Sequence, residues 1–367
     1  MKSLSDSKVE RLRSFAATPD FSTTKYRIVK ELARGGMGVV YVAEDPDLAR
    51  RIAIKVLNGL EPEPGLARRM MREAKIIAGL EHPGIVPVHD VGVLPDGRVF
   101  YAMKLVQGER LDEYAARVDS IKDRLRKFQA ACEAVAFAHA HGVIHRDLKP
   151  QNIMIGSFGE VLVLDWGVAK VLREEQQVSI EEEPQHEHPR TLPALTKEAG
   201  QDRHTVAPRD TEDTTHGTIL GTPVYMSPEQ ARGEIETVDR RSDVYSLGAI
   251  LFFLLTNEPP KDHAALTLSG NGRSRAFARP RELNSKITKA AEAVCLKAMA
   301  VERTDRYANA GGLAAEVALL LDDQPVAAHR ENAFEKAGRW VNKNRFLILL
   351  VLAYLLMRIF FILTSRG

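Results

Sequence analysis

The clearest candidate for a reactive site is the sequence His-Arg-Asp-Leu-Lys-Pro-Gln-Asn at residues 145–152. Asp147 is a carboxylate that could accept the proton of an attacking hydroxyl group. Asn152, and Asp165 of a later Leu-Asp-Trp-Gly sequence, carry the oxygen atoms that Mg²⁺ prefers as ligands. Lys149 could neutralise a phosphate group during its transfer. In this order and at this spacing, the four residues indicate phosphoryl transfer to a hydroxyl group.

A second group of residues, nearer the N-terminus, suits phosphate binding. Gly35, Gly36 and Gly38 lie between two predicted strands, where small residues let backbone N–H groups approach phosphate oxygens closely. Lys55, in the next predicted strand, could reach the same phosphates. Glu73, in the helix predicted after it, is a natural ion-pair partner for Lys55. Each feature is common by itself, so the interpretation depends on their occurring together.

Hydrophobic patterning predicts the elements that would position these residues. Alternating apolar residues over 26–57 predict three antiparallel strands, and residues 91–106 predict a hairpin with Pro-Asp-Gly at its turn. Small strands are predicted over 152–164. Apolar residues at helical spacing predict helices at 66–80, at 125–140 and over much of 242–321. Residues 1–24 are polar and are predicted to be flexible.

Composition narrows the class of protein. The chain has 367 residues, of which 44% are hydrophobic and 27% charged, as in a globular enzyme. Its net charge of +2 argues against a nucleic-acid partner, for which a basic face is expected. Cys132 and Cys295 lack metal-binding spacing and are predicted to be buried thiols in a reducing compartment. Residues 174–213 are rich in Glu, Pro, His, Thr and Gln and predict a disordered insertion.

The C-terminal end has a different character. Of the eighteen residues 346–363, fourteen are Leu, Ile, Phe or Val, and Arg358 is charged. Each of the fourteen favours insertion by roughly 0.3–0.6 kcal/mol, against a cost of at most about 3 kcal/mol for the arginine. We therefore predict a single transmembrane helix after a basic juxtamembrane linker at 323–345, with Trp340 as an interface anchor. A buried or dimer-forming helix is the alternative.

The orientation of that helix follows from the charges before it. The N-terminus has no apolar signal-peptide core, so the bulk of the chain is expected in the cytoplasm. The positive-inside rule agrees, because basic residues precede the apolar segment. These are Lys336, Arg339, Lys343 and Arg345.

Together, these motifs resemble those of the eukaryotic-like serine/threonine protein kinases of bacteria, of the membrane-anchored type, over residues 26–321. The resemblance implies an α+β, two-lobed protein kinase fold over 25–322. Its β-rich N-lobe would span 25–106 and its helical C-lobe 107–322, with ATP and Mg²⁺ as cofactors and proteins as substrates. Lys149 resembles the serine/threonine branch rather than the tyrosine branch.

The resemblance also assigns roles to single residues. Asp147 would be the catalytic base, Asn152 and Asp165 the metal ligands, and Lys55 the partner of Glu73 and of the α- and β-phosphates. The nucleotide pocket would be formed by the glycine-rich loop, whose first glycine is replaced by Ala33, and by Val40, Ala53, Met103, Val106 and Met154.

Further residues resemble structural parts of the family. Residues 221–231 (GTPVYMSPEQA) resemble the segment that seats a protein substrate, and Glu229 within it would form a buried bridge with Arg306. Asp243 would brace the His-Arg-Asp turn. The family's usual Asp-Phe-Gly sequence is here Asp-Trp-Gly at 165–167. Trp166 would take the packing role of the phenylalanine with a larger side chain.

Regulation is predicted in the long segment before Glu229. Thr214, Thr215 and Thr218 are candidates for phosphorylation, and a phosphothreonine would dock on Arg146 and order the segment. Alternatively, these threonines are only polar turn residues. A homodimer that autophosphorylates in trans is compatible with this arrangement.

Two other functions compete with a protein kinase. A membrane-anchored pseudokinase would use the fold as a binding module, but all the catalytic residues are present. A kinase that acts on small molecules would lack the substrate segment at 221–231.

Overall fold

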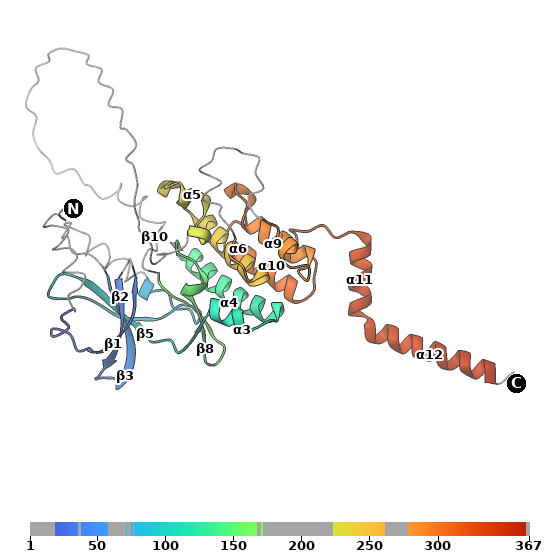
Figure 1. The fold of residues 1–367 in the computed structure, drawn as a ribbon, viewed down its shortest axis with the longest axis horizontal. Coiled ribbons are helices and arrows are strands. Elements are labelled where there is room, and N and C mark those ends of the chain that lie inside the picture. The colour runs from blue at the N-terminus through green and yellow to red at the C-terminus, as the bar shows by residue number, and fades with distance from the viewer. Residues whose placement is uncertain are drawn as a thin grey trace, which may run out of the picture.

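The computed structural model describes residues 19–35, 38–57, 71, 75, 77–166, 170–171, 223–260 and 278–364. Within these residues, a β-sheet lobe is joined to a helical lobe, and two further helices extend from the helical lobe to the C-terminus (Figure 1). The predicted insertion at 174–213 lies outside the described residues. So does most of the helix predicted at 66–80, although Met71, Lys75, Ile77 and Ala78 are helical.

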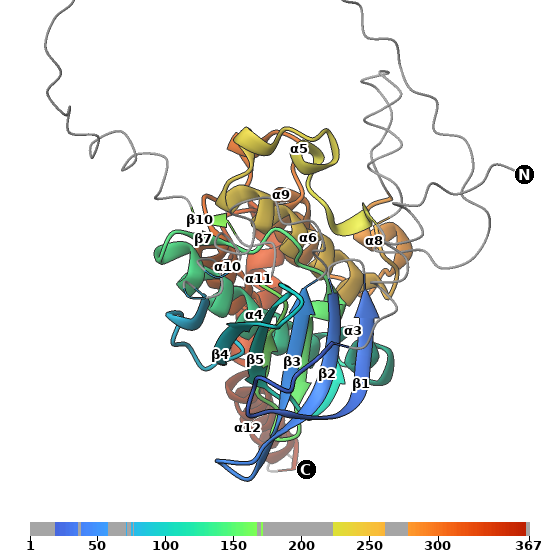
Figure 2. The same ribbon diagram turned by 90° about the vertical axis from the view of Figure 1, so that its left-hand side faces the viewer.

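The N-terminal lobe contains one antiparallel sheet with the strand order β1-β2-β3-β5-β4, seen side by side in Figure 2. Its strands are β1 (Arg27–Gly35), β2 (Gly38–Asp45), β3 (Arg50–Leu57), β4 (Val88–Val93) and β5 (Val99–Lys104). Strands β1 to β3 confirm the three predicted strands, and β4 and β5 confirm the hairpin. The hairpin turn needs a glycine, because Gly97 has a φ of 84°.

An aromatic cluster covers part of this sheet and includes a residue that precedes β1. Phe21 is buried, and its ring lies edge-on to Tyr41 and Phe100, with centroid distances of 6.2 and 5.9 Å. Such aromatic pairs add about 0.5–1.5 kcal/mol beyond the area they bury. The predicted flexible N-terminus is therefore wrong at Phe21, because this burial fixes the residue against the sheet.

The C-terminal lobe is built from helices around one apolar core. The helices are α3 (Leu111–Arg117), α4 (Ile121–Ala140), α5 (Pro228–Ala231), α6 (Arg240–Thr256), α8 (Pro280–Leu283), α9 (Lys289–Ala298) and α10 (Ala310–Leu321). Helix α6 is buried on nearly all sides, as expected for a helix that is apolar around its circumference. Cys132 and Cys295 are both buried free thiols, as predicted.

Short strands at the junction of the lobes carry the loops of the candidate site. Strands β6 (Gly108–Arg110), β8 (Ile153–Gly156) and β9 (Val161–Val163) form one small sheet, and β7 (Val143–Ile144) pairs with β10 (Lys170–Val171). Strands β8 and β9 confirm the small strands predicted over 152–164. Between β7 and β8 lies one turn of 3-10 helix, η1 (Pro150–Asn152).

The chain ends in helices α11 (Ala333–Lys343) and α12 (Arg345–Thr364). The predicted linker at 323–345 is thus helical over its second half, from Ala333 onward. Taken singly, no helix in the part of the chain that the structure describes is long and apolar enough to cross a membrane. The stretches Ala333–Val341 and Arg345–Arg358 pass that test of length and composition only as a pair, and they meet at a bend of 72°.

Candidate active site

The loop after strand β7 brings three of the predicted site residues together. Lys149 Nζ lies 2.8 Å from Asp147 Oδ2. The Asn152 side-chain amide donates to Asp147 Oδ2 at 3.2 Å and to the Asp147 carbonyl oxygen at 2.8 Å. The Asp147 side chain is 28% exposed, so a substrate can reach the carboxylate. The loop therefore presents an accessible, positioned carboxylate beside a cation.

Asp243 of α6 anchors this loop from the core. Its carboxylate accepts the backbone N–H groups of His145 and Arg146 at 2.8 and 2.9 Å. Arg146 has a φ of 70°, a conformation rarely adopted by residues other than glycine and common at functional sites. Burial alone would raise the pKa of Asp243, but the hydrogen bonds from the His139 side chain and from the His145 backbone N–H help to lower it.

His139 of α4 completes this anchor and was not predicted from the sequence. Its Nδ1 accepts the Ala310 backbone N–H at 3.4 Å, so its Nε2 carries the proton and donates to Asp243 at 2.9 Å. No pattern around His139 distinguishes it from any other histidine in an amphipathic helix. Its partners come from positions distant in the sequence.

A second anchor links the loop to the segment at 223–231. The Gln230 side chain donates to the Arg146 carbonyl oxygen at 2.8 Å. The neighbouring Glu229 forms a buried ion pair with Arg306 at 2.8 and 3.0 Å and accepts the Ser242 hydroxyl at 2.7 Å. Burial alone would raise the pKa of Glu229, but the hydrogen bonds from Arg306 and Ser242 lower it to about 2.

Lys55 of strand β3 enters the site from the sheet. Its ammonium group contacts Asp165 Oδ1, and the Lys55 residue is 5% exposed. Asp165 has a φ of 59°, which for a residue other than glycine costs about 1–3 kcal/mol. The predicted partner Glu73 lies outside the described residues, so its pairing with Lys55 stays a prediction.

Trp166 packs beneath the loop. Its side chain is buried, and its ring lies 4.6 Å from that of His145, measured between centroids. The indole N–H donates to the Val163 carbonyl oxygen at 3.1 Å, so the larger ring brings a polar group that finds a partner. The His145 Nε2 atom lies 2.8 Å from the Leu164 carbonyl oxygen. This contact connects the loop after β7 with the loop after β9.

The model of the family described as "Protein kinase domain" matches residues 26–314. The chain belongs to the protein kinase family. It is 37% identical over 251 residues to the serine/threonine-protein kinase PknD of Protochlamydia amoebophila, which covers 64% of this chain and 23% of that protein. It is 35% identical over 315 residues to PknB of Mycolicibacterium smegmatis, another serine/threonine-protein kinase, which covers 84% and 44%.

These matches confirm the predicted family, the bacterial serine/threonine protein kinases. The chain spans less than half the length of these two curated relatives. Among solved structures, it is similar to the PknI kinase domain of Mycobacterium tuberculosis, with a TM-score of 0.56 and 24% identity over 80% of this chain and 96% of that one. That likeness supports the two-lobed fold. The family implies the use of ATP and a divalent metal ion.

Sheet register places part of the predicted nucleotide pocket beside Lys55. Val40 lies opposite Lys55 in the β2–β3 pair, and Ala53 lies opposite Met103 in the β3–β5 pair. Residues directly opposite share a face of the sheet, as do residues two apart in one strand. Val40, Ala53, Lys55 and Met103 therefore line one face.

The other two predicted pocket residues lie outside this sheet. Val106 follows strand β5 and packs against the C-lobe core, and Met154 lies in β8 opposite Leu162. Tyr101 was missed by the sequence analysis, although it lies opposite Lys55 and is buried. Its spacing of two residues from Met103 would have placed it on the same face.

The glycine-rich turn contains glycines with different structural requirements. A Cβ atom on Gly38 would lie 2.2 Å from the Val56 carbonyl oxygen, and the φ of Gly38 is 155°. A Cβ atom on Gly35 would meet nothing within 4 Å. Gly36 lies outside the described residues, and Ala33 pairs with Val40 in the sheet. Of these two described glycines, only Gly38 must be a glycine for the strands to pair as they do.

Proposed function

We propose that the chain is an ATP-dependent serine/threonine protein kinase that transfers the γ-phosphoryl group of ATP to Ser or Thr hydroxyls of proteins. The observation that carries this proposal is the arrangement of Asp147 between Lys149 and Asn152, together with the ion pair between Lys55 and Asp165. The kinase family and the serine/threonine class of the relatives support it.

The residues fit Mg²⁺ as well as ATP. The Asn152 nitrogen is used within the loop, which leaves the amide oxygen as a ligand, and Asp165 supplies a carboxylate. When bound, Mg-ATP supplies the phosphoryl group and neutralises charge between its phosphates. Mg²⁺ keeps several waters and needs few protein ligands, so two oxygen donors are sufficient.

Asp147 would act on the substrate hydroxyl. Its Oδ2 atom already accepts from Lys149 and Asn152, so Oδ1 is the oxygen that would take the proton. Asn152 fixes the carboxylate, Lys149 offsets its charge and that of the transferred group, and Lys55 holds the phosphates. Catalysis would then consist mainly of positioning and electrostatic stabilisation.

Protein substrates, rather than small molecules, are favoured by the segment at 223–231. Gln230 connects this segment directly to the backbone of Arg146, and the Glu229–Arg306 pair fixes the segment to the core. A substrate seated there would lie beside the catalytic loop.

Regulation by autophosphorylation is the second part of the proposal. Thr214, Thr215 and Thr218 lie outside the described residues, and Arg146 is the cation that a phosphothreonine among them would contact. Two chains that phosphorylate each other would form a transient homodimer.

The third part concerns localisation. We infer that the apolar segment at 346–363, which lies within α12, anchors the kinase to the cell membrane as a single pass, with the kinase domain in the cytoplasm. The stretch Arg345–Arg358 does not pass the test of length and composition by itself, so this inference rests on the full eighteen-residue segment of the sequence. Apolar side chains of α12 are exposed rather than packed against the domain, as shown by Phe346, Leu350 and Leu356 at 74%, 68% and 67% exposed. This exposure disfavours the alternative of a helix buried within the same chain.

The test is transfer of radiolabelled phosphate by the full chain with Mg-ATP, beside Lys55→Met and Asp147→Asn, with sites mapped by mass spectrometry. We expect phosphothreonine at Thr214, Thr215 or Thr218 in the wild type only. A folded wild type that incorporates no phosphate and transfers none to generic proteins would support the pseudokinase alternative. Transfer to small molecules alone would favour the other competing function.

A further inference from the structure

The segment that connects the kinase domain to α11 is fixed to the C-lobe. Val326 is 4% exposed and belongs to the main apolar core. The buried Glu316 of α10 accepts the backbone N–H groups of Ala327 and Ala328 at 2.9 and 3.1 Å. The position of the chain at residue 328 is therefore set by the kinase domain.

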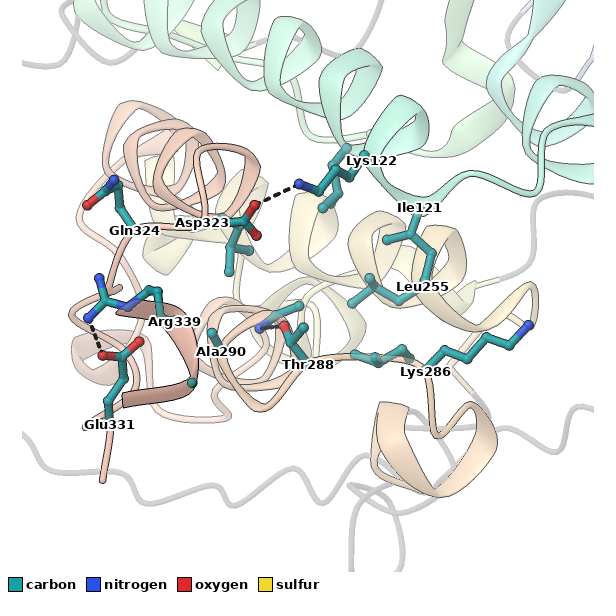
Figure 3. A pocket seen from close by; sticks show the side chains of 15 residues that line it. Ile121, Lys122, Leu255, Lys286, Thr288, Ala290, Asp323, Gln324, Glu331 and Arg339 are labelled. Atoms are coloured by element: carbon teal, nitrogen blue, oxygen red, sulfur yellow. Dashed lines mark hydrogen bonds and ion pairs between the residues drawn. The ribbon is translucent and has the colours of Figure 1, made fainter. Parts of the chain in front are cut away.

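Helix α11 is linked to the C-lobe by an ion pair, and to the connecting segment before it by two further contacts. Glu335 forms an ion pair with Lys289 of α9 at 2.6 Å and contacts His329 at 3.0 Å. Arg339, four residues later on the same face, pairs with Glu331 at 2.5 Å. Figure 3 shows Arg339 and Glu331 beside the cavity of about 480 Å³ that separates α11 from the C-lobe.

The electrostatics of Glu335 agree with this attachment. The side-chain hydrogen bond from Lys289, followed by those from the Asn332 backbone cap and from His329, lowers the pKa of Glu335 to about 2. Glu335 is therefore charged at physiological pH, as its ion pair with Lys289 requires.

The apolar residues of α11 have no such contacts and are exposed. Phe334 is 88% exposed, Trp340 61% and Val341 49%. Phe334 and Val341 are seven residues apart, which places them on one side of the helix, and Trp340 borders that side. Gly338 and Arg339, by contrast, line the cavity against the C-lobe. The helix thus joins the domain through polar side chains and exposes aromatic ones.

The position of α12 indicates what covers the exposed side. Figure 1 shows α11 between the C-lobe and α12, with α12 extending away from the domain. The bend of 72° means that α11 would lie close to the membrane plane if α12 ran along the bilayer normal. Lys336 and Arg345 are exposed cations near this junction and suit anionic headgroups.

We propose that α11 is an interfacial helix that lies in the headgroup region of the bilayer, with Phe334, Trp340 and Val341 in contact with lipid and the C-lobe clamped to its other side. This inference rests on the membrane anchoring by α12 proposed above. Interfacial helices bury their apolar side about 5–10 Å into the boundary between headgroups and acyl chains. The kinase domain would then be held at a fixed orientation to the membrane.

Trp340 is a built-in probe of this contact. The chain contains two tryptophans, and the other, Trp166, is buried in the active site. The full chain would be incorporated into single-copy nanodiscs of phosphatidylcholine and phosphatidylglycerol, with brominated lipids as quenchers. The difference in fluorescence between wild type and Trp340→Phe reports Trp340 alone.

We expect the Trp340 emission to be blue-shifted, and to be quenched more by bromines near the headgroups than by bromines at the chain ends. Phe334→Glu should weaken this quenching. Phe158→Glu is the matched control, because Phe158 is 98% exposed in the turn between β8 and β9, and it should leave the quenching unchanged.

The outcomes separate this inference from the proposals on which it rests. A chain that floats with lipid vesicles, but whose Trp340 is unquenched by brominated lipid and open to iodide, would overturn the interfacial role and leave the anchor intact. Shielding of Trp340 only when two copies share a disc would assign the surface to a second chain and also overturn it. A chain that does not float would refute the anchor itself. Phosphate transfer, measured separately, is independent of all three outcomes.

Discussion

The loop that carries Asp147 and the strand that carries Lys55 both contribute to the candidate active site, but different interactions hold them in place. The loop is held by buried polar groups: Asp243 accepts two of its backbone N–H groups, and Gln230 donates to its carbonyl oxygen. Lys55 is held by strand register, between neighbours in β2 and β5.

This difference follows from the backbone. A strand satisfies its own N–H and C=O groups by pairing, so its side chains need only a sheet around them. A loop at a strained turn has no such ladder, and its polar groups must find partners supplied by distant residues. Substitutions that remove an anchor of the loop should therefore destabilise the C-lobe core. Substitutions in the strand should have only a local effect.

The largest effect on stability is expected at the ion pair that anchors the segment at 223–231. Arg306→Ala leaves the Glu229 carboxylate buried without its partner, and loss of one member of a buried pair costs about 3–5 kcal/mol. The free energy of unfolding from urea titrations measures this. Arg303→Ala is the control, because the Arg303 pair with Asp239 is more exposed and should contribute at most about 1 kcal/mol.

The same pair predicts a dependence on pH. The pKa of Glu229 falls from its ordinary value of 4.5 to about 2 in the folded protein. Its contribution to stability is therefore complete above pH 4.5 and is lost as the pH falls toward 2. The double variant Glu229→Gln with Arg306→Met should lose this part of the acid dependence. An unchanged acid profile in the double variant would contradict the assignment.

A substitution of Lys55 in strand β3 should lower catalytic activity and leave stability unchanged. Lys55→Met removes a cation from the phosphates, and loss of one such electrostatic contact costs about 10²–10³-fold in kcat. The urea midpoint should stay within experimental error, because β3 keeps its register. A fall in stability comparable with that of Arg306→Ala would contradict the proposed difference between the loop and the strand.

A smaller effect is expected within the glycine-rich turn. Gly38→Ala places a methyl group against the Val56 carbonyl oxygen and should destabilise the N-lobe by about 1–3 kcal/mol, as other overpacked sites do. Gly35→Ala has open space and should change stability by less than about 0.5 kcal/mol. Equal thermal shifts for the two variants would show that strand pairing does not distinguish these glycines.

The smallest effect is expected at Trp166. Trp166→Phe loses one hydrogen bond, worth about 0.5–1.5 kcal/mol, and the Val163 carbonyl oxygen still accepts the Val86 N–H at 3.2 Å. Calorimetry beside Trp340→Phe, an exposed control, measures the difference. A large loss of stability would mean that the indole ring is essential to the packing against His145.

The order of the motifs was enough to predict the two lobes, the small strands and the clustering of Asp147, Lys149 and Asn152, since each depends on short-range patterns. The contributions of His139, Gln230 and Tyr101 were not predicted. Two of these bond to residues far away in the chain, which no local pattern encodes. The burial of Phe21 was missed because a single aromatic residue in a polar stretch gives no periodicity. The helix at residues 333–343 was not predicted, because their basic residues led to the interpretation of this stretch as a linker.

The central claim is that Asp147 acts as the base of a protein kinase. The most direct test measures nucleotide affinity and the rate of phosphate transfer together in full-length Asp147→Asn. We predict unchanged binding of Mg-ATP, with kcat for transfer to a protein substrate lowered about 10²–10⁴-fold, as expected for loss of a general base. Transfer at the wild-type rate, in a variant that binds nucleotide normally, would contradict this role.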